Sequence, residues 1–186
     1  MAEYRKLSFR FWTDPRVHSL DVYQKIILSY CITGIHPCKF TNVSGIYEMP
    51  RGSLCDAVRL DIKQVAEALE FFNQERPDLL EYDSENHMVF VKSFFKHNSK
   101  YRKDISGLMD DFENTFHKTP QFWAEFGEKN RSYICKHFKN ITDENQINFL
   151  ERLFNLKNEI SEIPSKKPII IDKKNLSLAN ESSLAK

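Results

Sequence analysis

The chain has 186 residues, of which 41% are hydrophobic and 28% charged, and its formal net charge is +1. This balance is ordinary for a globular protein and excludes a protein that binds every polyanion through a large net charge. Its apolar runs are only a few residues long and its N-terminus lacks the apolar segment of a signal peptide. We therefore expect a cytoplasmic protein without a transmembrane helix or a membrane partner.

The N-terminal residues predict a short strand followed by two helices. Residues 4–12 alternate partly between polar and apolar side chains, which is typical of an edge strand. Asp14 before Pro15 predicts a helix start, because Asp caps helices and proline fits the first turn. Ser19 or Asp21 is expected to cap the next helix. Its predicted core-facing residues are Val22, Ile26, Ile27, Tyr30 and Cys31.

The stretch from Gly45 to Lys92 carries the most specific pattern. Asp61 with Gln64 three residues later is typical of a capping box at a helix start. The order of elements is that of a winged helix-turn-helix, which usually places its second helix in a DNA groove. The predicted elements are a strand at 45–50, helices at 51–59 and 61–74, and a hairpin that joins 80–82 to 88–91.

The C-terminal part predicts three more helices. Thr119-Pro120 and Thr142-Asp143 mark two helix starts, and Gly127 and Asn130 are possible interruptions of the helix between them. The first of the three helices is predicted by a stripe of apolar residues at helical spacing, which consists of Ile105, Leu108, Met109, Phe112 and Phe116.

These patterns predict a mostly α protein that is locally α+β. We expect a winged helix-turn-helix domain over 1–98, a helical extension over 99–160 and a flexible tail over 161–186. The tail is rich in Ser, Lys and Asn, which favours a disordered segment or a docking peptide.

Motifs for catalysis or metal binding are lacking in the sequence. The four cysteines form no CxxC pair, the six histidines form no HxxxH or HExxH pattern, and no GxSxG, Walker A or GxGxxG motif occurs. A metal site from Cys31, His36, Cys38 and Cys55 is imaginable, but its spacing fits no familiar zinc module. Buried thiols at Cys31 and Cys55 are the better interpretation, so we expect no enzyme, metal or cofactor.

Basic residues in and after the predicted winged helix are candidates for DNA contacts. Lys63 and Gln64 lie on the outer face of its second helix and could reach base edges, although Glu67 and Glu70 share that face and repel phosphates. No acid occurs between Glu85 and Asp104, which favours this segment for phosphate binding. The full set of candidates is Arg51, Arg59, Lys63, Gln64, Lys92, Lys96, Lys100, Arg102 and Lys103.

The first 100 or so residues resemble the N-terminal winged-helix domain of phage replisome-organiser and DnaD-like replication initiation proteins. The resemblance rests on the order and type of residues in Tyr4–Pro15 with Val17–Leu20, in Gly45–Pro50, and in Leu79–Asp83 with Val89–Asn98. It implies binding of origin DNA and recruitment of the replicative helicase or its loader. It also implies self-association through the winged-helix domain.

Three hypotheses follow for the function. The first is a non-catalytic, phage-type replication initiation protein that binds DNA and recruits a helicase or loader. The second is a winged-helix adaptor or inhibitor from a mobile element that acts through another protein. The third is a dimeric transcriptional regulator whose C-terminal helices form the dimer interface.

Overall fold

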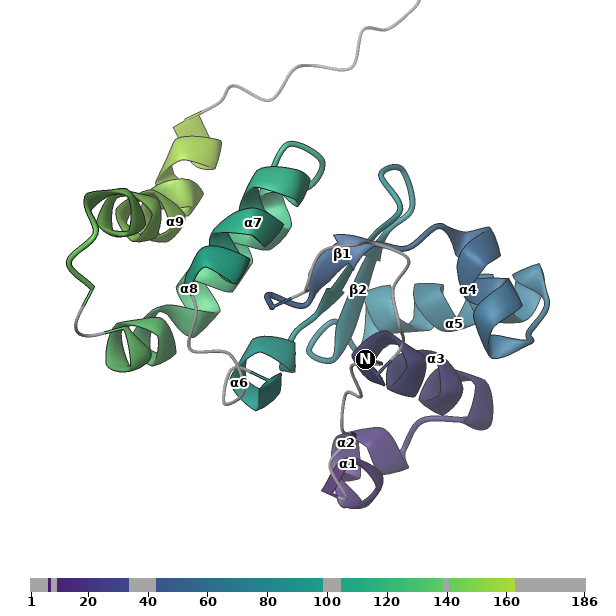
Figure 1. Ribbon diagram of the computed structural model, residues 1–186. Helices are drawn as coiled ribbons and strands as arrows, with labels where there is room; N and C mark the ends of the chain where they lie inside the picture. The colour runs from purple at the N-terminus through teal and green to yellow at the C-terminus, as the bar shows by residue number, and fades with distance from the viewer. Residues whose placement is uncertain (1–6, 8–9, 34–42, 99–104, 139–140, 163–186) are drawn as a thin grey trace, which may run out of the picture.

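The computed structural model describes residues 7, 10–33, 43–98, 105–138 and 141–162. This part is mostly helical and contains one small antiparallel sheet (Figure 1). In chain order its elements are α1 (Arg10–Thr13), α2 (Pro15–His18), α3 (Val22–Thr33), β1 (Ile46–Glu48), α4 (Arg51–Val58), α5 (Ile62–Glu75), β2 (Leu80–Asp83), β3 (Met88–Val91), α6 (Phe94–Asn98), α7 (Ile105–Thr115), α8 (Pro120–His137) and α9 (Glu144–Glu162).

The sheet has the strand order β1-β3-β2, with both pairs antiparallel. The central strand β3 places Phe90 opposite Ile46 of β1 and Val89 opposite Tyr82 of β2. All four residues of β3 are buried. Because successive side chains of a strand point to opposite faces, burial of the whole strand means that both faces of the sheet are covered.

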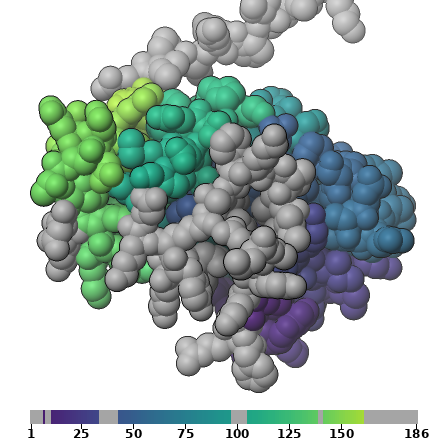
Figure 2. All heavy atoms as spheres, viewed as in Figure 1, coloured from purple at the N-terminus to yellow at the C-terminus, as the bar shows by residue number. Residues whose placement is uncertain are grey.

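Helices cover the two faces of the sheet in separate layers (Figure 1). On one face, Val89 and Val91 join a core built with α3, α4 and α5. On the other face, Met88 and Phe90 join a core built with α7, α8 and α9. Figure 2 shows the same division on the surface, where the C-terminal helices and the first helices lie on opposite sides of the molecule.

The C-terminal helices share their core with the sheet. Ile46, Met88, Phe90 and Phe95 belong to the same buried cluster as Trp123 and the other apolar residues of α7–α9. The predicted boundary at residue 98 therefore falls between elements that depend on each other for burial. Of the predicted tail, residues 163–186 lie outside the described part.

The turn between α4 and α5 forms as its sequence predicts. Asp61 Oδ1 accepts a hydrogen bond of 2.8 Å from the Gln64 amide, and Gln64 Oε1 accepts one of 3.1 Å from the Asp61 amide. This reciprocal pair is the predicted capping box. Arg59 ends α4 in the left-handed region, at φ 58°, which turns the chain sharply toward α5.

The N-terminal predictions are confirmed in part. The predicted edge strand is wrong where it is described, because helix α1 begins at Arg10; residues 4–6 and 8–9 lie outside the description. Asp14 caps α2, and Asp21 rather than Ser19 caps α3, because its Oδ1 accepts a 2.8 Å hydrogen bond from the Gln24 amide. The expected core positions Val22 and Ile26 are exposed, whereas Ile27 and Cys31 are buried as predicted.

Helix α8 runs without interruption through both expected breaks. Gly127 lies where the helix meets α9, and a Cβ added there would come within 2.4 Å of the Leu153 carbonyl oxygen. Asn130 is buried and donates from Nδ2 to the Phe126 carbonyl oxygen at 3.0 Å. Both residues therefore serve the close packing of α8 inside the C-terminal layer.

Candidate nucleic-acid interface

The outer face of α5 is acidic. Lys63 is exposed, and its Nζ lies 3.8 Å from Glu67 Oε1 one turn later. Glu70 accepts a hydrogen bond from Gln74, and Glu75 is also exposed. The side chain of Gln64 folds back to cap its own helix, so its carbonyl oxygen is already engaged and is not extended toward a base edge.

The hairpin tip carries acids as well. Asp83 Oδ1 accepts hydrogen bonds from the amides of Glu85 and Asn86 at 2.9 and 3.2 Å. Burial acts to raise the pKa of Asp83, but the hydrogen bonds from Asn86 and Glu85 outweigh it and lower the pKa. Residues 51–91 hold four Lys and Arg against nine Asp and Glu. The α4–α5 pair and the β2–β3 hairpin therefore repel phosphates over much of their surface.

The two arginines that flank α4 differ in availability. Arg51 is half-buried, and its guanidinium carbon lies 5.8 Å from the centre of the Tyr82 ring. Arg59 is exposed and lines a surface pocket with Cys55, Asp56 and Leu60. Arg59 is thus the more accessible of the two for a phosphate.

Lys92 is buried, contrary to its expected role as a phosphate contact. Only 4% of its side chain is exposed, and its Nζ lies 2.8 Å from Glu81 Oε2 of β2. It also pairs with Glu125 of α8 and lies 4.0 Å from the centre of the Phe90 ring. Two carboxylates and an aromatic ring enclose this ammonium group, so Lys92 leaves the set of candidate DNA contacts.

The surroundings of Glu125 show why the buried lysine is tolerated. Burial acts to raise the pKa of Glu125, but hydrogen bonds from Lys129 and Lys92 outweigh it and lower the pKa. The ionised carboxylate of Glu125 therefore balances the charge of Lys92. The ion pairs of Lys92 with Glu81 and Glu125 join β2, the end of β3 and α8. Lys92 consequently anchors the C-terminal layer to the sheet.

Replacing Lys92 with alanine is expected to lower the free energy of unfolding by about 1–2 kcal/mol. Loss of a buried partner normally costs more, but both glutamates stay 27% exposed and can be hydrated. Urea unfolding followed by circular dichroism measures the change. Lys129→Ala is the matched control, since it removes an exposed partner of Glu125 and should change stability by less than about 0.5 kcal/mol. Equal effects of the two substitutions would contradict an anchoring role for Lys92.

The remaining post-hairpin candidates divide at residue 98. Lys96 lies on α6 and is exposed. Lys100, Arg102 and Lys103 lie outside the described residues. Among the described residues of the basic segment, Lys96 is therefore a candidate that is accessible to a phosphate.

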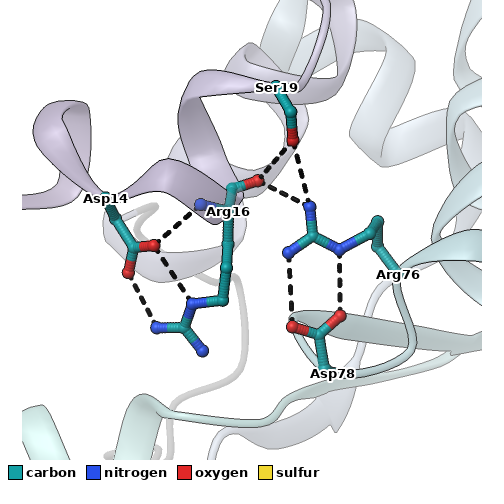
Figure 3. Close-up of polar contacts among 5 residues, drawn as sticks. All are labelled: Asp14, Arg16, Ser19, Arg76 and Asp78. Atoms are coloured by element: carbon teal, nitrogen blue, oxygen red, sulfur yellow. Dashed lines mark hydrogen bonds and ion pairs between the residues drawn. The ribbon is translucent and has the colours of Figure 1, made fainter.

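Two further arginines, Arg16 and Arg76, belong to a polar cluster that joins α2 to the end of α5 (Figure 3). The Arg76 Nη1 group donates to the Arg16 carbonyl oxygen at 2.7 Å and to Ser19 Oγ at 3.2 Å. Arg76 also pairs with Asp78, and Arg16 pairs with Asp14 at 2.7 Å. Because Arg76 holds α2 against the end of α5 and Arg16 pairs within its own turn, these arginines serve the fold rather than a ligand.

This cluster predicts a loss of stability in acid. The side-chain hydrogen bond from Arg16 lowers the pKa of Asp14 from its ordinary 3.8 to about 2. A lowered folded-state pKa stabilises the fold above pH 4, and this contribution disappears as pH falls from 4 to 2. We expect it to stay below about 1 kcal/mol because the pair is exposed to solvent. A nuclear magnetic resonance titration of Asp14 should give a midpoint near pH 2; a midpoint near 4 would contradict the ion pair. In urea unfolding at several pH values, the Asp14→Asn chain should lose less stability than wild type as the pH falls from 4 to 2.

Reactive and metal-binding groups are not assembled in the described part of the chain. Burial raises the pKa of the Cys31 thiol to about 12, which leaves it protonated. Cys55 is half-buried, and Cys38 and His36 lie outside the description. Within the described ranges, no group of three or more His, Cys, Asp or Glu is placed to hold a metal ion. None of the helices there has the length and apolar character that crossing a bilayer requires.

Comparisons with known proteins give no relative for this chain. No protein-family model matches it, and neither a curated protein nor a solved structure is significantly similar to it. The function of this chain is therefore inferred from its residues and their geometry, together with the resemblance of its first 100 or so residues.

The sequence patterns overlooked one basic element, the second half of α8. No acid occurs between Glu128 and Asp143, and this interval contains Lys129, Arg131, Lys136, His137 and Lys139. The signal is visible in the sequence, because residues 129–142 lack acids just as residues 86–103 do. The periodicity of the apolar residues, in contrast, indicates only the buried side of the helix.

Proposed function

We propose that the unit from α3 to β3 is a winged helix-turn-helix. The order of its elements supports this, since a helix and a strand precede the helix pair α4–α5, and the β2–β3 hairpin follows. The tight turn at Arg59 and the sheet order β1-β3-β2 fit the same arrangement, with α5 as the second helix of the motif.

We further propose that the chain is a non-catalytic DNA-binding protein of phage-type replication initiation. The observation that carries the proposal is the contrast in charge along the winged helix. The helix pair and hairpin are acidic, whereas the segment after β3 has no acid up to Asp104 and presents Lys96 to solvent. DNA is therefore bound by this basic segment, while α5 stays out of the groove. The replication setting, with its helicase or loader as partner, rests on the resemblance of the first 100 residues.

Fluorescence anisotropy with labelled duplex and single-stranded DNA tests this function. The full chain is expected to bind at 50 mM salt and to lose affinity steeply at 200 mM, because phosphate contacts release counterions. Neutralising the segment with Lys100→Gln, Arg102→Gln and Lys103→Gln should weaken binding, whereas Lys63→Gln on α5 should leave it unchanged. Lack of binding to both kinds of DNA at 50 mM salt would refute the proposal.

The acidic face of α5 favours a second candidate, a contact with a protein of basic surface. Glu67 and Glu70 are exposed on this face and would lie against lysines or arginines of such a partner. The double variant Glu67→Lys/Glu70→Lys should lose a host protein recovered by the wild-type chain, while its DNA affinity is kept or raised. Recovery of nucleic acid alone by the wild-type chain would remove this candidate. A dimeric regulator is less favoured, because the apolar stripes of α7–α9 already face the sheet.

A further inference from the structure

The second half of α8 presents basic residues along one side. Lys129, Tyr133, Lys136 and His137 follow each other at i, i+4, i+7 and i+8, so they share one face of the helix. Lys136 and His137 are exposed, and 51% of the Lys129 side chain is accessible. With 1.5 Å of rise per residue, Lys129 and Lys136 are about 10 Å apart along the helix axis.

Helix α6 lies beside this face of α8. The ring of Phe95 meets the ring of Tyr133 edge-on at 5.6 Å, and Tyr133 in turn stacks on His137 at 3.9 Å. Figure 1 shows α6 next to the C-terminal end of α8. Lys96 is exposed and follows Phe95 on α6, so a lysine on α6 and the basic residues of α8 lie on neighbouring elements, although they are more than thirty residues apart in sequence.

Both acids of α8, Glu125 and Glu128, are already paired. Glu125 is held by Lys92 and Lys129, and Glu128 pairs with Lys157 of α9 at 2.9 Å. Asp143 accepts a hydrogen bond from the Gln146 amide at the start of α9. For Lys96 and Lys136, by contrast, no ion pair is found among the described residues. The surface consequently carries a local excess of positive charge despite a net charge of only +1 for the chain.

We propose that this surface, the α6–α8 face, binds the sugar–phosphate backbone of nucleic acid. We define it by Lys96, Lys129, Lys136 and His137 around Tyr133. The inference rests on the DNA-binding function proposed above, and it extends the binding site from the segment after the hairpin onto the C-terminal layer. Lysine ammonium groups bind phosphates as point charges, and a row of them follows a backbone without reading its bases.

The composition of the α6–α8 face selects nucleic acid over other partners. Among the described residues, the exposed large apolar side chains lie on other elements, at Trp12, Val22, Tyr23, Ile26, Ile62 and Ile147. The face thus lacks the apolar anchors with which a protein helix or a membrane surface is bound.

The test compares two double variants of the full chain by fluorescence anisotropy. Lys96→Gln/Lys136→Gln removes two charges from the α6–α8 face, and Lys63→Gln/Arg152→Gln removes two exposed charges on α5 and α9 as the matched control. The probes are a fluorescein-labelled 30-base-pair duplex and a 30-nucleotide single strand, titrated between 50 and 200 mM NaCl. Circular dichroism spectra establish that all chains are folded.

We expect the α6–α8 variant to bind roughly tenfold more weakly at 50 mM salt, and its salt slope to fall by about 2, one unit for each lost phosphate contact. The control variant should bind like wild type, and the tighter of the two probes identifies the form of nucleic acid. Wild-type affinity and slope in the α6–α8 variant would overturn the inference while leaving DNA binding by residues 100–103 intact. Failure of the wild-type chain to bind either probe would overturn the proposed function and the inference together.

Discussion

A chain that ends at residue 98 is expected to lose its cooperative fold, although it contains every element of the proposed winged helix. Ending there removes α7–α9 and bares one face of the sheet. Val43, Ile46, Met88, Phe90 and Phe95 are each at least 95% buried and belong to the core on that face. Each such side chain contributes about 1.5–3 kcal/mol when buried, so their exposure forfeits on the order of 10 kcal/mol. This is comparable to the whole stability of a typical domain, about 5–15 kcal/mol.

Chromatography and circular dichroism of the shortened chain measure this loss. The 1–98 chain should be insoluble or bind an apolar dye and lack a sharp unfolding transition. A chain that ends at residue 162 is the matched control, because it keeps both cores and should unfold at the same midpoint as the full chain. A monomeric 1–98 chain with a cooperative transition would show that the sheet and helices α1–α6 do not need the C-terminal layer.

The elements from Gly45 to Val91 could be predicted from sequence because their signals are local. Asp61 and Gln64 are three residues apart and cap the same helix turn, and the structure places that turn as expected. The strand Met88–Val91 is predicted by its propensity, and its four consecutive apolar residues also indicate burial on both faces. A strand with one face in solvent would alternate, so the second layer of helices was foreseeable at this one strand.

The role of Lys92 could not be predicted, because its partners are distant in sequence. Glu81 lies eleven residues before it and Glu125 thirty-three residues after it, and only the packing of α8 on the sheet brings the three together. A lysine in a basic segment was expected to be solvated, which is the usual state of lysine. Burial of one member of a charged run is a tertiary effect that neither spacing nor composition indicates.

The negative charge of the outer face of α5, in contrast, is predictable from the sequence. The apolar periodicity of the helix places Glu67 and Glu70 on its outer side, and Glu75 and the acids of the hairpin add to the negative charge. The pairing of α6 with α8 was not readable, since the contact between Phe95 and Tyr133 joins two segments with no pattern in common. The proposed interface therefore combines the basic segment after the hairpin, which is evident from the sequence, with helix α8, whose position beside α6 is known only from the fold.

Replacing Gly127 with alanine is expected to lower the free energy of unfolding by about 1–2 kcal/mol. The added methyl group would meet the Leu153 carbonyl oxygen at 2.4 Å, far inside van der Waals contact. The obstacle is backbone of α9, so the two helices must separate, and overpacking of this kind costs about 1–3 kcal/mol or more. Alanine favours a helix over glycine by about 1 kcal/mol, which offsets part of the loss. Urea unfolding followed by Trp123 fluorescence measures the net change.

Gly52→Ala is the matched control for this substitution. Gly52 also lies in a helix, but a Cβ added there has no neighbour within 4 Å, so alanine should raise the free energy of unfolding by about 0.5 kcal/mol. Opposite signs at the two glycines would show that the approach of α8 to α9 decides the result, and not helix propensity. Equal stabilisation by both substitutions would mean that a Cβ at residue 127 lies farther than 2.4 Å from the Leu153 carbonyl oxygen, and hence that α8 and α9 are farther apart. Because α8 carries both the Glu125 partner of Lys92 and the α6–α8 face, loosening it should also weaken nucleic-acid binding in the Gly127→Ala chain and leave the Gly52→Ala chain unchanged.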